Sequence, residues 1–307
     1  MCVDNLITLG VIVAAIVLDW VLGEPRRYHP LVWFGGVSDR IEQINEHPEF
    51  ERISPFARGF CCWLILVLPP TVAIWLLLIW LPSPAQWVLE CLIVYFSIGW
   101  KSMQEHAYEV HKYLVAKEID KARVSVSKIV SRKTDELDER EIAKGAVEAV
   151  IENGSDCVLS PIFWYLLLGA PGALMFRLAN TLDAMWGNKT DRYVEFGRAS
   201  ARIDDILNWI PARLTAIGYA ICGKFACAWW CMNNQKAESE GPNAGLVMAA
   251  GGGALEIKLG GPAIYHGKLD VRPVLGAGRE VEVRDIVRSI RLLGRTIGFW
   301  LLVLAIV

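Results

Sequence analysis

Residues 60–81 read FCCWLILVLPPTVAIWLLLIWL, and residues 86–100 read QWVLECLIVYFSIGW. The first stretch contains no charged side chain, and a helix that crosses a bilayer needs about 20 apolar residues. Only the short loop Pro82–Ala85 separates the two stretches. The sequence therefore predicts a transmembrane hairpin, with Pro69-Pro70 as the expected site of a kink.

The composition also indicates a membrane protein. The chain has 307 residues, 54% of them hydrophobic, and includes 13 Trp. Its mean hydropathy of +0.35 is too high for an ordinary soluble protein, and Trp is enriched where a bilayer meets water. The net charge of −2 gives no reason to expect nucleic acid as a partner. None of the eight Cys forms a CxxC pair, which argues against a zinc site or a disulfide framework.

Further apolar stretches extend the prediction along the chain. Leu6–Leu22 is expected to be a retained span, and Ile297–Val307 reaches spanning length if the helix begins near Ile290. Ile162–Phe176 is interrupted by Gly and Pro, and Leu214–Met232 contains Lys224. Each of these two stretches fits a span, a re-entrant pair of half-helices or a buried helix.

We therefore predict a mainly α, polytopic membrane protein with about four or five transmembrane helices and a helical, loop-rich cytoplasmic part. Residues 1–307 form one domain in this interpretation. Transmembrane helices 1–3 lie in residues 1–100, with a cytoplasmic loop at 23–59. A catalytic part follows at 101–291, and a C-terminal transmembrane helix at 292–307.

The distribution of Lys and Arg gives the orientation. Lys101–Lys144 is rich in both residues, whereas the loop Pro82–Ala85 has neither. Because basic loops remain in the cytoplasm, we expect Lys101–Lys144 and Gly23–Gly59 to be cytoplasmic. The protein is then expected in the cytoplasmic (inner) membrane, with its active site facing the cytoplasm.

Between Gly145 and Arg213 the chain has an unusual density of charged and amide side chains. Polar groups close to a membrane are costly unless they are paired or functional. Glu148, Glu152 and Asp156 follow at i, i+4 and i+8, which places three carboxylates on one face of an α-helix. Hard oxygen ligands without His or Cys favour Mg²⁺, although a solvated helix face is the alternative.

A second constellation follows at Asn180, Asp183 and the segment 202–213. The segment contains Arg202, Asp204, Asp205, Asn208 and Arg213. Arginine binds phosphate or carboxylate through two parallel hydrogen bonds, so this pattern favours a phosphorylated substrate. Salt bridges between buried helices are the competing interpretation. From Gly241 to Gly278 the chain is rich in Gly and Pro, which predicts a loop-heavy module whose backbone amides are suited to bind an anion.

Taken in order, these pieces resemble the CobD/CbiB family of integral-membrane proteins. The matching stretches are DWVLGEPRRYHP at 19–30, VEAVIENGSD at 147–156, NTLDAMWG at 180–187, ARIDD at 201–205, PARL at 211–214, GPN at 241–243 and LGGP at 259–262. One departure is visible, because the family usually has Arg-Asp-Thr where this chain has Arg132-Lys133-Thr134.

The resemblance implies an amide-forming synthase of adenosylcobalamin biosynthesis. Such an enzyme joins the free propionate carboxylate of adenosylcobyric acid to 1-amino-2-propanol or its O-phosphate. ATP and Mg²⁺ are expected as co-substrate and cofactor, a corrinoid as substrate, and the lipid bilayer and other cobalamin-assembly enzymes as partners. The alternatives are a membrane transporter or carrier of corrinoids without ligase chemistry, and a regulatory protein that has kept only the fold.

The residues carried over as an expected site fall into three groups. The catalytic group is Glu148, Glu152, Asn153, Asp156, Asp183 and Arg202. The substrate- or phosphate-binding group is Arg26, His29, Arg132, Thr134, Arg177, Asn180, Asn208, Arg213, Asn243, Gly260, Gly261 and Tyr265. The metal-binding group is Glu148, Glu152, Asp156, Asp204 and Asp205. If they build one site, Gly145–Asp156, Asn180–Arg213 and Gly241–Pro273 must converge.

Overall fold

The computed structural model describes residues 2–25, 29–45, 47, 52–187, 193–235, 241–265 and 268–306. Helices dominate these residues, so the prediction of a mainly α protein is confirmed. Contacts divide the chain into two compact units. The first unit comprises Met1–Gly99 and Ser160–Asn208, and the second comprises Trp100–Leu159 and Trp209–Val307.

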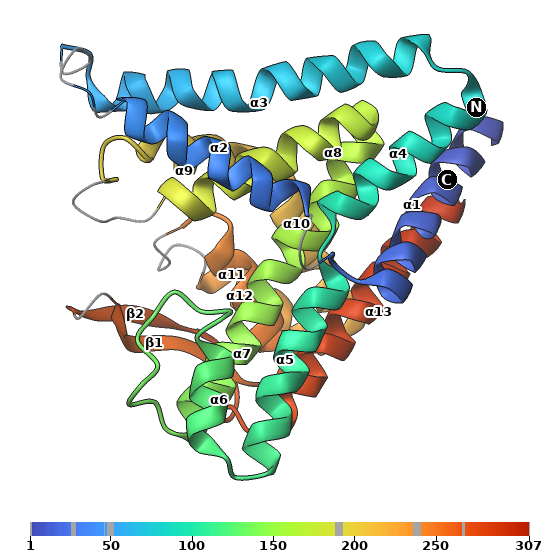
Figure 1. Ribbon diagram of the computed structural model, residues 1–307. Helices are drawn as coiled ribbons and strands as arrows, with labels where there is room; N and C mark the ends of the chain where they lie inside the picture. The colour runs from blue at the N-terminus through green and yellow to red at the C-terminus, as the bar shows by residue number, and fades with distance from the viewer. Residues whose placement is uncertain are drawn as a thin grey trace. The chain divides into compact units, whose positions relative to one another are not determined.

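The first unit consists of helices packed around an aromatic core. Its helices are α1 (Cys2–Leu22), α2 (Pro30–Asn45), α3 (Pro55–Trp80), α4 (Ser83–Ser97), α8 (Ser160–Trp186) and α9 (Arg198–Leu207) (Figure 1). Trp63 from α3 and Trp186 from α8 are buried in one hydrophobic cluster with Phe34 from α2. Helix α3 begins where the Ser54 hydroxyl accepts a hydrogen bond from the Ala57 amide, which caps the helix.

Four helical stretches among the described residues are long and apolar enough to cross a membrane. They are Asn5–Leu22, Pro55–Trp80, Glu139–Trp186 and Arg284–Ile306. The polytopic prediction is therefore confirmed. Helix α4 follows α3 as expected, but its 15 residues fall short of a full span.

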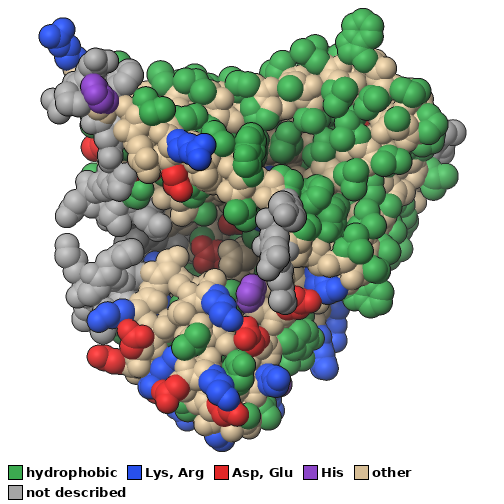
Figure 2. All heavy atoms as spheres, viewed as in Figure 1, with side chains coloured by type: hydrophobic (Ala, Val, Ile, Leu, Met, Phe, Trp, Pro, Cys, Tyr) green, Lys and Arg blue, Asp and Glu red, His purple; other side chains and the backbone are tan. Residues whose placement is uncertain are grey.

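Exposed side chains agree with this assignment. Hydrophobic side chains cover the visible surface over α3 and α4 in Figure 2, and Ile65, Trp75 and Ile79 are among those exposed on α3. Lys, Arg, Asp and Glu instead gather over α5 (Trp100–Val115) and α6 (Ile119–Val126) of the second unit in the same view. The first pattern suits contact with lipid, and the second suits contact with water.

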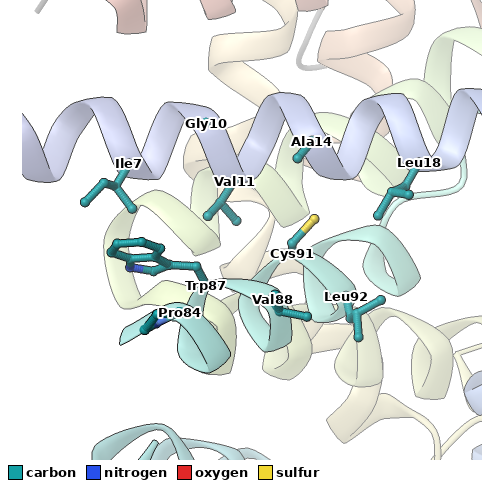
Figure 3. Close-up of a pocket in the computed structure, with 10 residues that line it drawn as sticks. All are labelled: Ile7, Gly10, Val11, Ala14, Leu18, Pro84, Trp87, Val88, Cys91 and Leu92. Carbon is teal, nitrogen blue, oxygen red and sulfur yellow. The ribbon is translucent and has the colours of Figure 1, made fainter. Parts of the chain in front are cut away.

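A groove of about 530 Å³ lies between α1 and α4 within the first unit. Figure 3 shows Ile7 and Val11 of α1 facing Trp87 and Cys91 of α4. All of its lining residues are apolar apart from the Cys91 thiol, and no acid, base or cation lines it. The groove therefore offers no group suited to acid–base or phosphate chemistry.

The two ambiguous apolar stretches are both interrupted. Within α8, Gly169 has φ 68° and ψ −162°, a conformation outside the helical range, so the expected break at Gly169–Gly172 is confirmed. Leu214–Met232 is divided between α10 (Trp209–Cys222) and α11 (Phe225–Asn234), which are separated at Gly223-Lys224. Neither α10 nor α11 is long enough to cross a bilayer by itself.

The second unit adds a β-hairpin to its helices. Its further elements are α7 (Glu139–Gly154), the π-helical segment η2 (Ser155–Leu159), α12 (Ala244–Leu255), β1 (Lys258–Tyr265), β2 (Lys268–Gly276) and α13 (Arg284–Ile306). Helix α7 starts with a capping box, in which Asp138 and Glu141 each accept a hydrogen bond from the other's backbone amide at 2.8 Å. An Asp followed three residues later by Glu is a sequence signature of this kind of helix start.

The prediction of a loop-heavy module over Gly241–Gly278 is wrong. Helix α12 is buried along its whole length, and β1 and β2 pair antiparallel with a bulge between Gly260 and Pro262. The glycines of α12 serve close packing, because a Cβ atom at Gly251 would lie 2.7 Å from Ile151 and one at Gly253 would lie 2.7 Å from Ala228. Glycine content alone does not separate this use from a loop.

We predict that Gly169→Ala destabilises the protein by about 1–3 kcal/mol, because the backbone region that Gly169 occupies is essentially restricted to glycine. Space is not the obstacle, since a Cβ atom at Gly169 would meet only Pro171 at 3.7 Å. Thermal unfolding of the purified protein in detergent measures the change. Gly298→Ala in α13 is the control, because a Cβ atom there meets nothing within 4 Å. Equal melting temperatures for the two variants would contradict the prediction.

Candidate functional site

Glu148 on α7 is the centre of a polar cluster in the second unit. Its Oε1 accepts a hydrogen bond of 2.7 Å from the Gly260 amide of β1, and its Oε2 lies 3.5 Å from Nη1 of Arg132. The side chains of Arg132 and Glu148 are only 6% and 13% exposed. A buried carboxylate requires such a partner, because an unpaired buried charge is strongly destabilising. The structure thus brings together three residues that the sequence predicted for the site.

Two glycines allow this approach. A Cβ atom at Gly145, on α7 near Glu148, would lie 2.7 Å from Nη2 of Arg132. Gly260 has φ 68°, and a Cβ atom there would collide with the backbone carbonyl of Pro273. The hairpin reaches Glu148 with its backbone amide because no side chain separates the strands at Gly260.

Glu152, one helical turn after Glu148, opens onto a cavity of about 120 Å³. The cavity is lined by Glu152, Gly241, Ala244, Gly245, Met248, Gly260, Arg272, Pro273 and Leu275. Ala244 and Gly245 form the first turn of α12, whose free amides carry partial positive charge. The cavity therefore combines one carboxylate with a guanidinium and a helix N-terminus.

Arg213 and Asn243 meet beside this cavity. Nη1 of Arg213 donates hydrogen bonds to Oδ1 of Asn243 at 3.3 Å and to the Trp209 carbonyl at 2.5 Å. The guanidinium also lies 3.9 Å from the centre of the Trp209 ring. Asn243 precedes the lining residue Ala244, so Arg213 contacts the side chain of the N-cap residue of α12.

The α-helical spacing that places Asp156 on one face with Glu148 and Glu152 does not extend to Asp156. Helix α7 ends at Gly154, and Asp156 lies in the π-helical η2, which has a wider turn. The transition is supported by α10, because the Tyr219 hydroxyl donates a hydrogen bond of 3.0 Å to the Ile151 carbonyl. A sequence pattern read at 3.6 residues per turn misses such a change.

No group of three or more His, Cys, Asp or Glu side chains among the described residues is arranged to hold a metal ion. The three carboxylates do not form a protein-only metal site. Mg²⁺ is commonly held by one or two carboxylates together with substrate phosphates. Glu152 supplies oxygen atoms of that type, whereas both oxygens of Glu148 are engaged by the Gly260 amide and Arg132. The assignment of Mg²⁺ stays a prediction.

The first unit contains a separate network around Asp204. Its Oδ1 accepts a hydrogen bond from Asn180 Nδ2 at 3.3 Å, and its Oδ2 accepts one from Asn208 Nδ2 at 2.9 Å. Asn208 in turn accepts a hydrogen bond of 2.8 Å from the Ser160 hydroxyl. Burial raises the pKa of Asp204 to about 6, although both amide donors act in the opposite direction. Both oxygens of Asp204 are already engaged, which does not favour the metal-binding role expected for it.

Other expected residues are placed apart from this network. Arg202 is exposed on α9, and Asp205 is half-buried, with a pKa raised by burial. The expected pairing of Arg202 with Asp204 towards one phosphate is not supported, because Asp204 points into the protein interior. Asp183 lies half-buried on α8.

His29 and Arg177 lie together in the first unit, with Glu24. Burial lowers the pKa of His29, Glu24 raises it, and Arg177 lowers it. The His29 ring accepts a hydrogen bond of 3.2 Å from the Leu31 amide at Nδ1, which orients the imidazole. Sequence reasoning missed Glu24, although it stands inside the same GEPRRYHP stretch.

The remaining expected residues are placed as follows. Thr134 is buried before α7, Asn153 is half-buried on α7, and Gly261 lies in β1 with φ 80°. Tyr265 belongs to β1, but its side chain lies outside the described residues, as does the whole of Arg26.

Sequence reasoning also missed Arg272 and Ser160, which carry no motif signal of their own. Convergence of all three motif regions stays a prediction, but Gly145–Asp156 and Gly241–Pro273 do meet within the second unit.

Comparisons with known proteins agree with these motifs. The family described as "CobD/Cbib protein" matches residues 12–293. The chain belongs to the CobD/CbiB family. The cobalamin biosynthesis protein CobD of Stutzerimonas stutzeri (strain A1501) is 45% identical over 293 residues, which cover 95% of each chain. CobD of Chromobacterium violaceum is 46% identical over 291 residues, covering 94% of this chain and 92% of the relative. No solved structure matches the chain.

The resemblance inferred from the sequence is therefore confirmed. In this CobD/CbiB chain, two of the clusters that contain motif residues have different properties. The Asp204 network consists of polar groups that satisfy one another. The cluster around Glu148 and Glu152 is adjacent to a cavity that a ligand can occupy. The second cluster is the stronger candidate for a reactive site.

The Asp204 network predicts a dependence of stability on pH. Because burial raises the pKa of Asp204 from 3.8 to about 6, the folded protein holds this proton more tightly than the unfolded chain. The resulting stabilisation is fully present below pH 3.8 and is lost as the pH rises through 6. Relative to Asp204→Asn, the wild-type free energy of unfolding should fall by on the order of 3 kcal/mol between pH 3.8 and pH 7.5.

Unfolding in detergent at several pH values measures this difference. Asp120→Asn serves as the control, because the Asp120 side chain is 95% exposed and its removal should leave the wild-type profile unchanged. Parallel profiles for wild type and Asp204→Asn would show that Asp204 does not titrate in this range.

Proposed function

We propose that this protein acts in cobalamin biosynthesis as an amide-forming synthase. In the proposed reaction, the free propionate carboxylate of adenosylcobyric acid is joined to the amine of 1-amino-2-propanol or its O-phosphate. Membership of the CobD/CbiB family and the names of its relatives support the biosynthetic role. The observation that carries the chemistry is the Glu152 carboxylate, which opens onto a cavity shared with Arg272.

Amide formation needs a neutral amine, and we assign to Glu152 the role of accepting the proton that the ammonium must lose. An amine at neutral pH is an ammonium and must lose a proton before it attacks a carbonyl carbon. A carboxylate in a cavity attracts the ammonium and then accepts its proton. Glu148 is held by Arg132 and the Gly260 amide, so we assign it the role of positioning α7 and the hairpin around Glu152.

The propionate carboxylate also needs activation, because hydroxide is a poor leaving group. We propose ATP as the co-substrate, with Mg²⁺ on the nucleotide phosphates. Transfer of the γ-phosphoryl group to a carboxylate oxygen gives an acyl phosphate and ADP, and attack of the amine on the acyl carbon then forms the C–N bond as phosphate leaves. The chain lacks the GxxxxGK[ST] phosphate loop, so its nucleotide contacts would come from other groups. No covalent intermediate on the enzyme is needed, and catalysis would depend on orientation and on electrostatic stabilisation.

We further propose that the protein resides in the cytoplasmic membrane with this site facing the cytoplasm. The four candidate spans support the membrane location. The Lys- and Arg-rich segment Lys101–Lys144 supports the orientation, and it includes Arg132, the partner of Glu148. Cobyric acid, aminopropanol phosphate and ATP would then be met on the cytoplasmic side. A corrinoid carrier, in contrast, would bind its ligand without any need for a nucleotide.

We predict that Glu152→Gln lowers the rate of amide formation by about 10²–10⁴-fold, because the substitution removes the proton acceptor. The assay combines purified protein with cobyric acid, aminopropanol phosphate and MgATP, and mass spectrometry detects the amide. Glu139→Gln is the matched control on the same helix, where Glu139 pairs with the exposed Lys117.

The result is interpreted together with the melting temperatures of both variants. A folded Glu152→Gln protein with wild-type turnover would remove Glu152 from the reaction. Absence of the amide product in the wild type, with tight corrinoid binding that needs no ATP, would favour a carrier over a synthase.

A further inference from the structure

The cavity beside Glu152 is too small for a nucleotide or a corrinoid. Its volume of about 120 Å³ is well below the roughly 300–1,000 Å³ of pockets that hold drug-sized ligands. Among the proposed reactants, only the amino-alcohol and its phosphate are of this size. The larger substrates would have to bind outside and present a reacting group at its opening.

The lining of the cavity carries two opposite charges. Glu152 on α7 supplies a negative charge, and Arg272 on β2 supplies a positive one that is close enough to act on the Glu152 carboxylate. The first turn of α12 adds backbone amides at Ala244 and Gly245, and neither residue has a long side chain that would fill the space. A small molecule with an ammonium at one end and an anionic group at the other matches this lining.

We infer that the cavity binds the amine substrate through both of its charges, and that Arg272 recognises the anionic group. This inference rests on the proposed amide-forming function. Glu152 binds the ammonium at one end, while the Arg272 guanidinium and the α12 amides bind phosphate oxygens at the other. Arg272 is therefore a specificity-determining residue, and none of the sequence motifs includes it.

The hairpin explains how Arg272 comes to face this cavity. Arg272 and Pro273 are the two residues of β2 that lie opposite Gly261 of β1 at the bulge, and the Pro273 carbonyl packs against Gly260. The Gly260 amide is bound to Glu148, so the same bulge connects β2 to the carboxylate face of α7. The end of β2 near the bulge is held by Gln235, which exchanges two hydrogen bonds of 2.8 and 2.9 Å with the backbone of Gly276. Arg272 is thus presented by a strand fixed on both sides.

Two measurements on the full-length protein in detergent test the inference. Isothermal titration calorimetry with 1-amino-2-propanol O-phosphate, in the absence of ATP and corrinoid, measures binding without turnover. Amide-forming assays then compare KM for this compound with KM for 1-amino-2-propanol. Arg272→Gln is compared with Arg284→Gln, a control at the start of α13 whose side chain is 67% exposed and lies outside the cavity.

We expect Arg272→Gln to weaken binding of the phosphorylated amine and raise its KM by about 10–100-fold, as for loss of a charge-assisted hydrogen bond. The KM for 1-amino-2-propanol should change by less than about threefold, because that compound has no anionic group. Arg284→Gln should match the wild type in both measurements, and all three proteins should melt at similar temperatures.

Other outcomes overturn the inference. Equal losses for both amines would show that Arg272 acts only on the structure, and no loss for either would place the anionic group elsewhere. Absence of binding by the wild type would remove the cavity as the amine site. Arg272-dependent binding without any amide product would sustain the cavity assignment but overturn the proposed synthase activity, so the two failures are distinguishable.

Discussion

The buried carboxylate of Glu148 imposes the constraint on which the candidate site depends. Removing one partner of such a buried pair typically costs about 3–5 kcal/mol, because a charge is then left without compensation. Arg132 and the Gly260 amide supply that compensation from two directions. The loop before α7 and the β-hairpin must therefore both close onto the helix. Because the loop and the hairpin close onto α7, Glu152 and Arg272 come to line one cavity.

Small residues make the closure sterically possible. Gly145 leaves room for the Arg132 guanidinium, and Gly260 lets the two strands of the hairpin meet at a bulge. The glycines of α12 bring that helix against α7 and α11 at distances that a side chain would prevent. In an apolar protein, such contacts provide packing where the hydrophobic effect between helices is weak. Backbone amides can then reach the functional carboxylates, which side chains would otherwise shield.

Features encoded within one short stretch of sequence could be predicted, and features that depend on distant partners could not. The spans follow from runs of apolar residues, and the break at Gly169 and the cap at Asp138 follow from local residue types. The hairpin and α12 resemble a loop because glycine serves both loops and close packing. The hydrogen bond between Glu148 and Gly260 joins residues 112 positions apart, and Arg272 acquires its place only through that pairing. The π-helical turn at Asp156 likewise depends on support from Tyr219 on another helix.

The partners of Asp204, Glu148 and Glu152 indicate which of these carboxylates has a structural role and which has a chemical one. Asp204 is surrounded by neutral amide donors, which engage both of its oxygens but do not offset the cost of burying a charge, so its pKa rises. Glu148 is matched by a guanidinium and a backbone amide, which fix the position of its carboxylate. Both groups have their partners within the protein. Glu152 instead lines a cavity that a ligand can enter, and Arg272 in the same lining can bind an anionic group of that ligand. A carboxylate that lines a cavity open to a ligand is the one expected to bind and deprotonate a substrate.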